Sequence, residues 1–290
     1  KFYVIFCKSL LVCVFAVMVI GACSGVGVIR GIIASAPTID DIVATPTGFL
    51  STVLDANGNQ TATLVASGSN RRAVTIDEIP KNLQHAFVAI EDERFYEHNG
   101  IDVTGIIRAG VKGVASGFHF SEGASTITQQ LLKNTVFTSW TSESSMADKF
   151  ERKFQEQYLA LQLEKVVDKD WILENYLNAI NLGQNTLGVG VASERYFGKD
   201  VSDLTLSDCA VLAAITQNPS KYNPITNPQE NSKRRMKVLN NMKDQGYISQ
   251  EEYDEAVADN VYDRIQLVNI ESETNSINYY FVDELSDQVI

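Results

Sequence analysis

The chain has 290 residues, of which 44% are hydrophobic and 9% aromatic, so it can bury a real core in one principal domain with appendages. Its 24 basic and 36 acidic residues give a formal charge of −12, which argues against a general nucleic-acid surface. An anionic ligand would therefore be met by a local group of basic side chains or by a divalent cation.

The first apolar stretch is long enough to cross a membrane. No charged residue lies between Lys8 and Arg30, and about 20 apolar residues span a bilayer as a helix. We predict a single transmembrane anchor at residues 1–34, and Lys1 and Lys8 favour an N-terminus inside the cell. A cleaved secretory signal and a lipoprotein signal ending at Cys23 are the alternatives. The apolar run continues past Cys23, which favours a retained anchor.

A small β-element is expected between the anchor and the rest of the chain. Residues 35–48 form a polar connector with two prolines. Two alternating segments follow, Phe49 to Leu54 and Thr61 to Val65, and Asn57-Gly58 between them is a strong hairpin signal. From Pro80 onward apolar residues recur mostly at helical spacing, so the main body is predicted to be α-helical.

The stretch from Glu91 to Lys133 carries more polar side chains than a packing element needs. Glu91 ends a predicted helix that begins near Pro80, and the aromatic residues Phe95 and Tyr96 follow closely. A carboxylate held there, partly shielded from water, could act as a general base. The structural alternative is a solvated acidic helix end paired with Arg94.

The second half of this stretch opens another helix. Ser125 or Thr126 followed by Gln129 or Gln130 is a capping signature. The first-turn amides of such a helix are donors to which anions bind readily. Taken alone, the pattern also fits an ordinary capped amphipathic helix.

Two later helices carry basic residues. Lys149, Arg152, Lys153 and Glu156 share a broad face of the helix predicted at 147–167, where the structural alternative is a surface ion pair. Arg234 and Arg235 lie on a final amphipathic helix, and we interpret that basic face as solvated.

Six motifs, taken in order, resemble one known family. They are EDxxFxxHxGxDxxGxxRA from Glu91, GxSTITQQLxKN from Gly123, RKxxExxxAxxLE from Arg152 with ILExYLN from Ile172, and ASERYFGK from Ala192 with LxLxDxAxLAAxxQNPxxYNP. This order resembles the family 51 glycosyltransferase domain of class A penicillin-binding proteins. The resemblance implies a mainly α, lysozyme-like domain at 49–260, with the hairpin as an accessory. It also implies that 261–290 is a linker toward a missing transpeptidase domain.

The resemblance implies a peptidoglycan glycosyltransferase at the outer face of the cell membrane. Such enzymes polymerise lipid II into a lipid-linked glycan strand by inverting transfer, with release of undecaprenyl pyrophosphate. Glu91 would be the general base and Glu156 a second acid. The substrate-binding residues implied are Asp92, His98, Arg108, Ser125, Thr126, Gln129, Gln130, Lys133, Asn134, Lys149, Arg152 and Lys153.

No cofactor is expected to be obligatory, although Mg²⁺ or Mn²⁺ near Glu156 would suit a pyrophosphate leaving group. The expected partners are lipid II, the growing strand, the membrane, and cell-division or elongation machinery. Apolar residues of the loop at 113–120, including Phe118 and Phe120, are expected to dip into the bilayer. A lytic lysozyme-like hydrolase and an inactive membrane-anchored scaffold are the alternative functions.

Overall fold

The computed structural model describes residues 2–38, 45–54, 56–58, 60–64, 70–116, 125–138, 140 and 143–265. Residues 266–290 of the predicted linker at 261–290 lie outside these ranges, as do the apolar residues Phe118 and Phe120. In chain order the elements are α1 Phe2–Ala34, β1 Ser51–Leu54, β2 Gln60–Leu64, α2 Lys81–Glu91, α3 Val103–Ala115, α4 Ile127–Thr135, α5 Met146–Leu163, α6 Lys169–Ala179, α7 Val189–Phe197, the short 3₁₀ helix Val201–Asp203, α8 Leu206–Ile215, α9 Pro228–Asp244 and α10 Gln250–Ala258.

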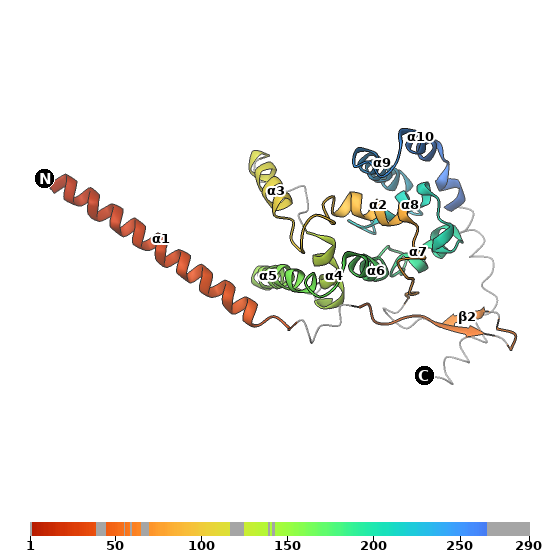
Figure 1. Cartoon of the computed structure of the whole chain (residues 1–290), viewed down its shortest axis with the longest axis horizontal. Coiled ribbons are helices and arrows are strands. Elements are labelled where there is room, and N and C mark those ends of the chain that lie inside the picture. The colour runs from red at the N-terminus through yellow and green to blue at the C-terminus, as the bar shows by residue number, and fades with distance from the viewer. Residues whose placement is uncertain are drawn as a thin grey trace.

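The predicted fold class is confirmed: the body is mainly helical, with one small hairpin and one long apolar helix before it (Figure 1). The hairpin pairs β1 with β2 in antiparallel register, from Ser51 opposite Leu64 to Leu54 opposite Gln60. Gly58 has a φ of +85°, which glycine adopts without a Cβ penalty in a tight turn.

Helix α1 projects from the body as a single rod. Its segment Lys8–Ala34 has 27 residues and contains an 18-residue window with a mean hydropathy of 2.5, so its length and composition suit a membrane crossing. Its C-terminal end rests on α5, where the Gln155 amide donates to the Ile32 carbonyl at 3.3 Å and to Ser35 Oγ at 3.1 Å. Ser35 Oγ in turn contacts the Glu151 carboxylate at 3.1 Å. The end of the apolar helix is therefore fixed to the body by polar contacts.

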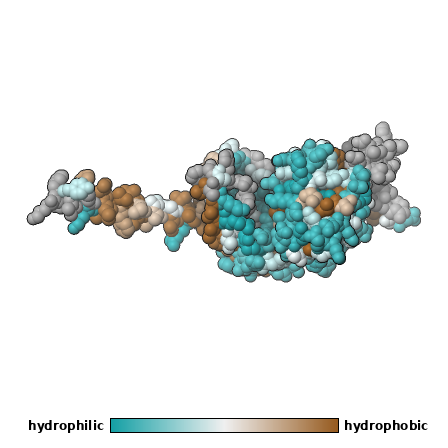
Figure 2. All heavy atoms as spheres, turned by 90° about the horizontal axis from the view of Figure 1, so that it is seen from above, coloured by the Kyte–Doolittle hydropathy of each residue, from teal (hydrophilic) through white to brown (hydrophobic). Residues whose placement is uncertain are grey.

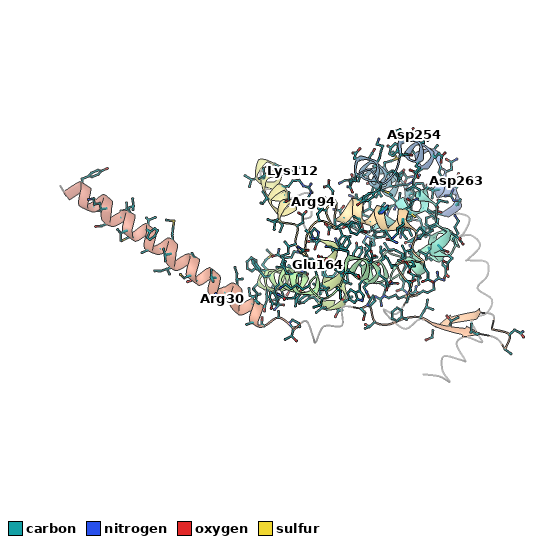
Figure 3. The ribbon with its side chains drawn as sticks, in the orientation of Figure 1. Arg30, Arg94, Lys112, Glu164, Asp254 and Asp263 are labelled. Atoms are coloured by element: carbon teal, nitrogen blue, oxygen red, sulfur yellow. The ribbon has the colours of Figure 1, made fainter. Side chains whose placement is uncertain are left out.

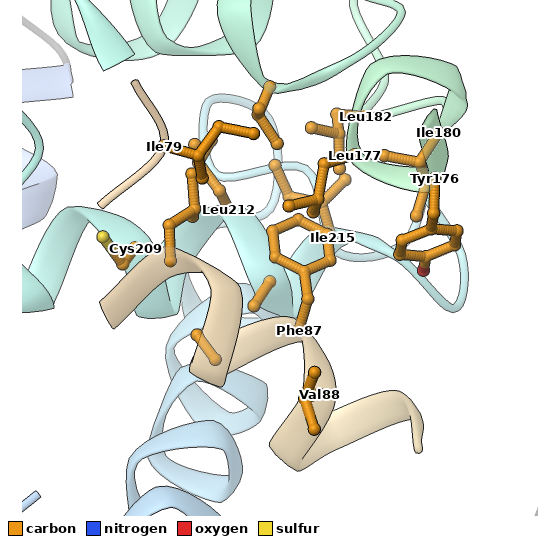
Figure 4. Packing of buried hydrophobic residues seen from close by; sticks show 14 of the residues in the cluster. Ile79, Phe87, Val88, Tyr176, Leu177, Ile180, Leu182, Cys209, Leu212 and Ile215 are labelled. Carbon is orange, nitrogen blue, oxygen red and sulfur yellow. The ribbon is translucent and has the colours of Figure 1, made fainter. Parts of the chain in front are cut away.

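The core forms around α2 and α8. Helix α2 packs against α8 and α9, and α4 packs against α5 and α6. The predicted apolar face of α2 is buried, because Leu83, Ala86 and Phe87 have no exposed surface. Phe87 meets Tyr176 of α6 edge to face, with ring centroids 6.1 Å apart (Figure 4). The packing of these side chains fixes the position of α2 in the body, and hence the position of Glu91 at its C-terminal end.

Side chains of another helix also contact the last turn of α2. The carbonyl of Ala89 accepts from the Asn241 side chain at 2.9 Å and from the Gln245 side chain at 3.1 Å, and both side chains come from the C-terminal end of α9. Helix ends leave carbonyl groups without partners in the helix itself, and side chains commonly satisfy them. This contact ties the C-terminal end of α2, with Glu91 on it, to α9.

A buried carboxylate joins the start of α8 to the chain after α10. Asp208 has no exposed surface, and its oxygens contact Lys199 Nζ at 3.0 Å and Arg264 Nη2 at 2.8 Å. It also completes a capping box with Thr205 at the start of α8. Burial by itself would raise the pKa of Asp208, but Arg264, Lys199 and the Thr205 amide lower this pKa below its usual value.

We expect Asp208→Asn to lower the free energy of unfolding by about 2–3 kcal/mol at pH 7, because two cations lose the carboxylate they face. A depressed carboxyl pKa contributes stability that is fully present above the ordinary pKa of 3.8 and is lost as pH falls below it. Denaturant unfolding at several pH values measures this contribution. Asp200→Asn, at an Arg72 pair with half-exposed side chains, is the control and should cost less than about 1 kcal/mol.

Candidate active site

Glu91 lies at the C-terminal end of α2, and side chains from three other elements converge on its carboxylate. Gln130 of α4 donates to Oε2 at 3.0 Å. Arg234 of α9 lies 3.3 Å from Oε1, and Thr216, which follows α8, makes a short hydrogen bond to the same oxygen. The Glu91 side chain is only 14% exposed. The carboxylate is thus held in one orientation while one edge stays within reach of a ligand.

Two of these contacts were not predicted from the sequence. The interpretation of Arg234 and Arg235 as a solvated face is wrong, because Arg234 pairs with Glu91 and Arg235 is buried against Ser207 at 2.8 Å. Arg234 also donates to Gln217 at 2.8 Å and lies 5.1 Å from the centre of the Tyr222 ring. Thr216 carries no motif of its own. Its nearest signal in the sequence is its place just before Gln217-Asn218-Pro219, where a helix must end.

Asp92 and His98 clamp the end of α2 to the start of α4. His98 Nε2 lies 2.9 Å from Asp92 Oδ1, and Asp92 Oδ2 accepts from the Ile127 amide at 2.9 Å. Asp92 is 6% exposed. Both side chains are therefore used within the protein, and they set the distance between Glu91 and α4.

The start of α4 is packed tightly against the chain between α2 and α3. Thr126 is the cap of α4 and accepts from the Gln129 amide at 3.2 Å, while its hydroxyl donates to the Gly100 carbonyl at 2.7 Å. Gly100 has a φ of +87°, and a Cβ there would lie 2.5 Å from the Ala160 carbonyl oxygen. Only glycine fits this approach. Thr126 and Gln129 are both 1% exposed, so they hold the start of α4 in place and are themselves shielded from a ligand.

The base of α3 is fixed by an ion pair. Arg94, which Figure 3 labels near α3, contacts Asp102, and Asp102 caps α3 by accepting from the Gly105 amide at 2.9 Å. Burial would raise the pKa of Asp102, but the hydrogen bonds from Arg94 and Gly105 lower it. Arg108, one turn into α3, pairs with Glu93 at 3.1 Å. A pocket opens here, and its lining includes Glu91, Asp92, Glu93, Asp102, Gly105, Arg108, Ser125 and Thr126.

A cluster of opposite charges covers the facing side of α5. Glu156 is 1% exposed and contacts Arg152 Nη1 and Lys153 Nζ, the latter at 2.9 Å. Arg152 Nε also donates to the Glu143 carboxylate at 2.8 Å, so the guanidinium lies between two carboxylates. Lys153 reaches across to α4, where Ser125 Oγ lies 2.8 Å from its ammonium. The Lys153 side chain is 39% exposed, so this cation remains open to a ligand.

Lys133, on the last turn of α4, adds a cation near this cluster. Burial lowers the pKa of Lys133, and the neighbouring Glu156 carboxylate partly offsets that effect. Its ammonium lies 4.6 Å from the centre of the Trp140 ring. Desolvated cations attract an anion more strongly than solvated ones, so the partly buried Lys133 is suited to a phosphate group, and Lys153 offers a second, more exposed ammonium beside it.

The surroundings of Glu156 do not suit a divalent cation. Both of its oxygens already face positively charged nitrogens of Arg152 and Lys153. Within the described ranges, no group of three His, Cys, Asp or Glu side chains could hold a metal ion.

Most of the predicted site residues come together. Glu91 and Gln130 form one part of the site, and Lys133, Arg152, Lys153 and Glu156 form another, with Ser125 joined to Lys153. Two predicted residues lie at the margin: Lys149 is exposed on the first turn of α5, and Asn134 is half-buried at the end of α4.

Comparison with known proteins identifies the relatives of this chain. A family model described as transglycosylase matches residues 57–243. The chain is 42% identical over 260 residues to penicillin-binding protein 1A of Clostridium perfringens. The aligned region covers 87% of this chain and 36% of the relative. It is 39% identical over 286 residues to penicillin-binding protein 1A/1B of Bacillus subtilis, covering 97% of this chain and 30% of the relative.

The solved structure of penicillin-binding protein 1A from Haemophilus influenzae matches with a TM-score of 0.41 and 25% identity, over 74% of this chain and 21% of that chain. This chain spans about a third of the length of the curated relatives named above. Over the part that it shares with them, this chain is similar to class A penicillin-binding proteins 1A and 1A/1B. The chain belongs to the transglycosylase family, whose members are peptidoglycan glycosyltransferases.

Proposed function

We propose that this chain polymerises lipid II into glycan strands, with release of undecaprenyl pyrophosphate, at the outer face of the cell membrane. The observation that supports this most directly is the pairing of one oriented carboxylate, Glu91, with separate cations on α4 and α5. Glycosyl transfer from a pyrophosphate donor needs both a base for the acceptor and positive charge for the leaving group.

In the proposed reaction Glu91 takes the proton of the acceptor's 4-hydroxyl. The freed oxygen attacks the anomeric carbon of the donor strand from the side opposite the pyrophosphate. The new carbon–oxygen bond forms as the bond to the pyrophosphate oxygen breaks, so the configuration inverts. The electron pair leaves with the pyrophosphate, beside Lys133 and Lys153.

The two cations of α5, Lys153 and Arg152, differ in how accessible they are to a ligand. Lys153 is partly exposed and is positioned by Ser125 at 2.8 Å, so it can meet a phosphate oxygen directly. Arg152 is held by Glu143 and Glu156 and is 15% exposed. Burial would lower the pKa of Arg152, but the Glu143 and Glu156 carboxylates raise it. We assign Arg152 and Glu156 to positioning Lys153, and Lys133 and Lys153 to the leaving group.

The surface next to α1 suits a lipid substrate. Helix α3 exposes four aliphatic side chains between 61% and 65%, namely Val103, Ile107, Val111 and Val114. Figure 2 shows hydrophobic side chains along α1 and again at the edge of the body beside it. A polyprenyl chain cannot leave the bilayer without exposing apolar surface to water. We propose that α3 lies in the membrane interface, beside the pocket that Glu91 and Arg108 line.

With the whole chain in liposomes, a polarity-sensitive fluorophore on Val111→Cys should emit at a shorter wavelength than the same fluorophore on Val257→Cys. Quenchers carried by the lipids should reduce the emission from Val111→Cys. The label belongs in a background without the cysteines of α1. Val257→Cys on α10, where the native side chain is 37% exposed, is the control and should report water. Equal emission and equal quenching at both positions would contradict the membrane contact of α3.

The proposed function is tested by supplying labelled lipid II to the whole chain in liposomes and separating the products by length. Long glycan strands support the proposal. Shortening of preformed glycan would instead indicate the lytic alternative, and a folded chain that does neither would indicate a scaffold. A hydrolase has no use for cations positioned for a leaving pyrophosphate, which is why the transferase is preferred.

A further inference from the structure

The residue that ends α8 contacts the proposed base more closely than its place in the sequence suggests. Thr216 Oγ1 makes a short hydrogen bond to Glu91 Oε1 and lies 3.1 Å from the carbonyl oxygen of Ala213 in its own helix. Thr216 is half-buried, so neighbouring atoms restrict the water that could replace this hydroxyl. The hydroxyl thus lies between two acceptors, one of which changes its charge if Glu91 takes a proton.

A hydroxyl has one proton to donate and lone pairs that accept. While Glu91 is ionised, the Thr216 hydroxyl donates to Oε1. Once Oε1 carries the proton taken from the acceptor sugar, the same hydroxyl can turn toward Ala213, donate to its carbonyl oxygen and accept the new O–H. Both arrangements use contacts that the structure already contains.

The other two side chains on Glu91 cannot make this exchange. Arg234 is a guanidinium, which donates hydrogen bonds and accepts none. Gln130 presents its amide nitrogen to Glu91, and its oxygen faces the hydroxyl of the buried Tyr176 at 3.5 Å. Of the three side chains placed on Glu91, Thr216 alone can serve the carboxylate and the carboxylic acid by turning only its O–H bond, whereas Gln130 would have to turn its whole amide over and give up its contact with Tyr176.

We propose that Thr216 is a positioning residue for the general base. Its hydroxyl donates a hydrogen bond to Oε1 while Glu91 is ionised, and it accepts a hydrogen bond from the protonated carboxyl group after proton transfer. This inference rests on the proposed function. It predicts a defect in turnover, because the hydroxyl touches Glu91 and its role requires no contact with lipid II. Removing a hydrogen bond to a charged group corresponds to a loss of about 10- to 100-fold.

The test measures kcat and KM for lipid II with the whole chain in liposomes. Thr216→Val keeps the shape of the side chain and removes the hydroxyl. We expect kcat to fall about 10- to 100-fold, with KM changed by less than about 2-fold. Thr216→Ser restores the hydroxyl and should return kcat to within about 3-fold of the parent.

Thr135→Val is the matched control. Thr135 is also half-buried at a helix end, and its hydroxyl bonds the Leu131 carbonyl at 2.9 Å. It should keep the parent kcat. Thermal unfolding of all variants separates a turnover defect from a folding defect.

The possible results separate the two proposals. If Glu91→Gln is inactive while Thr216→Val turns over like the parent, the positioning role is wrong and the proposed function stands. If the Thr216→Ser protein is as impaired as the Thr216→Val protein, the site needs a shape and not a hydroxyl, and the positioning role is also wrong. A parent chain that makes no glycan overturns both proposals.

Discussion

Glu91→Gln is expected to reduce the polymerisation of lipid II by about 10²–10⁴-fold, the range associated with loss of a general base. The amide is nearly the same size, but it cannot take a proton from the acceptor hydroxyl. It also places an NH₂ group where Gln130, Thr216 and Arg234 now donate to a carboxylate. The measurement is the initial rate of strand formation at saturating lipid II, beside thermal unfolding of the same protein.

Glu97→Gln is a control for this substitution. Glu97 follows the end of α2, in the loop that precedes α3, outside the contacts described for Glu91. It should retain the parent rate. Retention of activity by a folded Glu91→Gln protein would show that another group acts as the base, and the assignment of Glu91 would then be withdrawn.

Lys153→Met should lower kcat/KM for lipid II by about 10²-fold or more, because it removes a preorganised donor from the place where the leaving pyrophosphate gains charge. The methionine keeps most of the aliphatic stem. It leaves Glu156 with Arg152 as its remaining cationic partner, so the fold should persist while the site loses an open cation.

Lys237→Met on α9 is the matched control, since it removes one exposed positive charge outside the contacts described for Ser125 and Glu156. Lys153→Arg is informative as well, because a planar guanidinium cannot reproduce the single ammonium contact with Ser125 at 2.8 Å. A Lys153→Met protein with the parent rate would assign the leaving-group charge to Lys133 instead.

The sequence was sufficient to predict elements whose signals are local. The hairpin follows from Asn57-Gly58 between alternating segments, and α2 follows from Leu83, Ala86 and Phe87 at helical spacing. The cap of α4 required a choice between two hydroxyls, and the structure selects Thr126. These features depend on residues within a few positions of each other, which a single sequence contains.

The candidate site was predicted less completely because its contacts are long-range. Glu91 meets Thr216 and Arg234 across 125 and 143 positions of the chain. Helical periodicity shows which residues of α9 share a face, but it cannot tell whether that face meets solvent or a carboxylate on α2. Arg234 was therefore interpreted as solvated, and its Glu91 contact appears only when α2, α8 and α9 are packed together. The catalytic and binding roles of the predicted site residues remain proposals.

The joint between α1 and α5 has a mechanical consequence. At about 1.5 Å per residue, the 27 residues of Lys8–Ala34 extend about 40 Å, longer than the roughly 30 Å hydrocarbon layer. The surplus forms a stiff stalk that ends on Gln155, next to the residue that pairs with Arg152. If α1 crosses the bilayer, tilting it would tilt α5 with it. Membrane thickness would then set the height at which the cationic cluster meets the headgroups of its substrate.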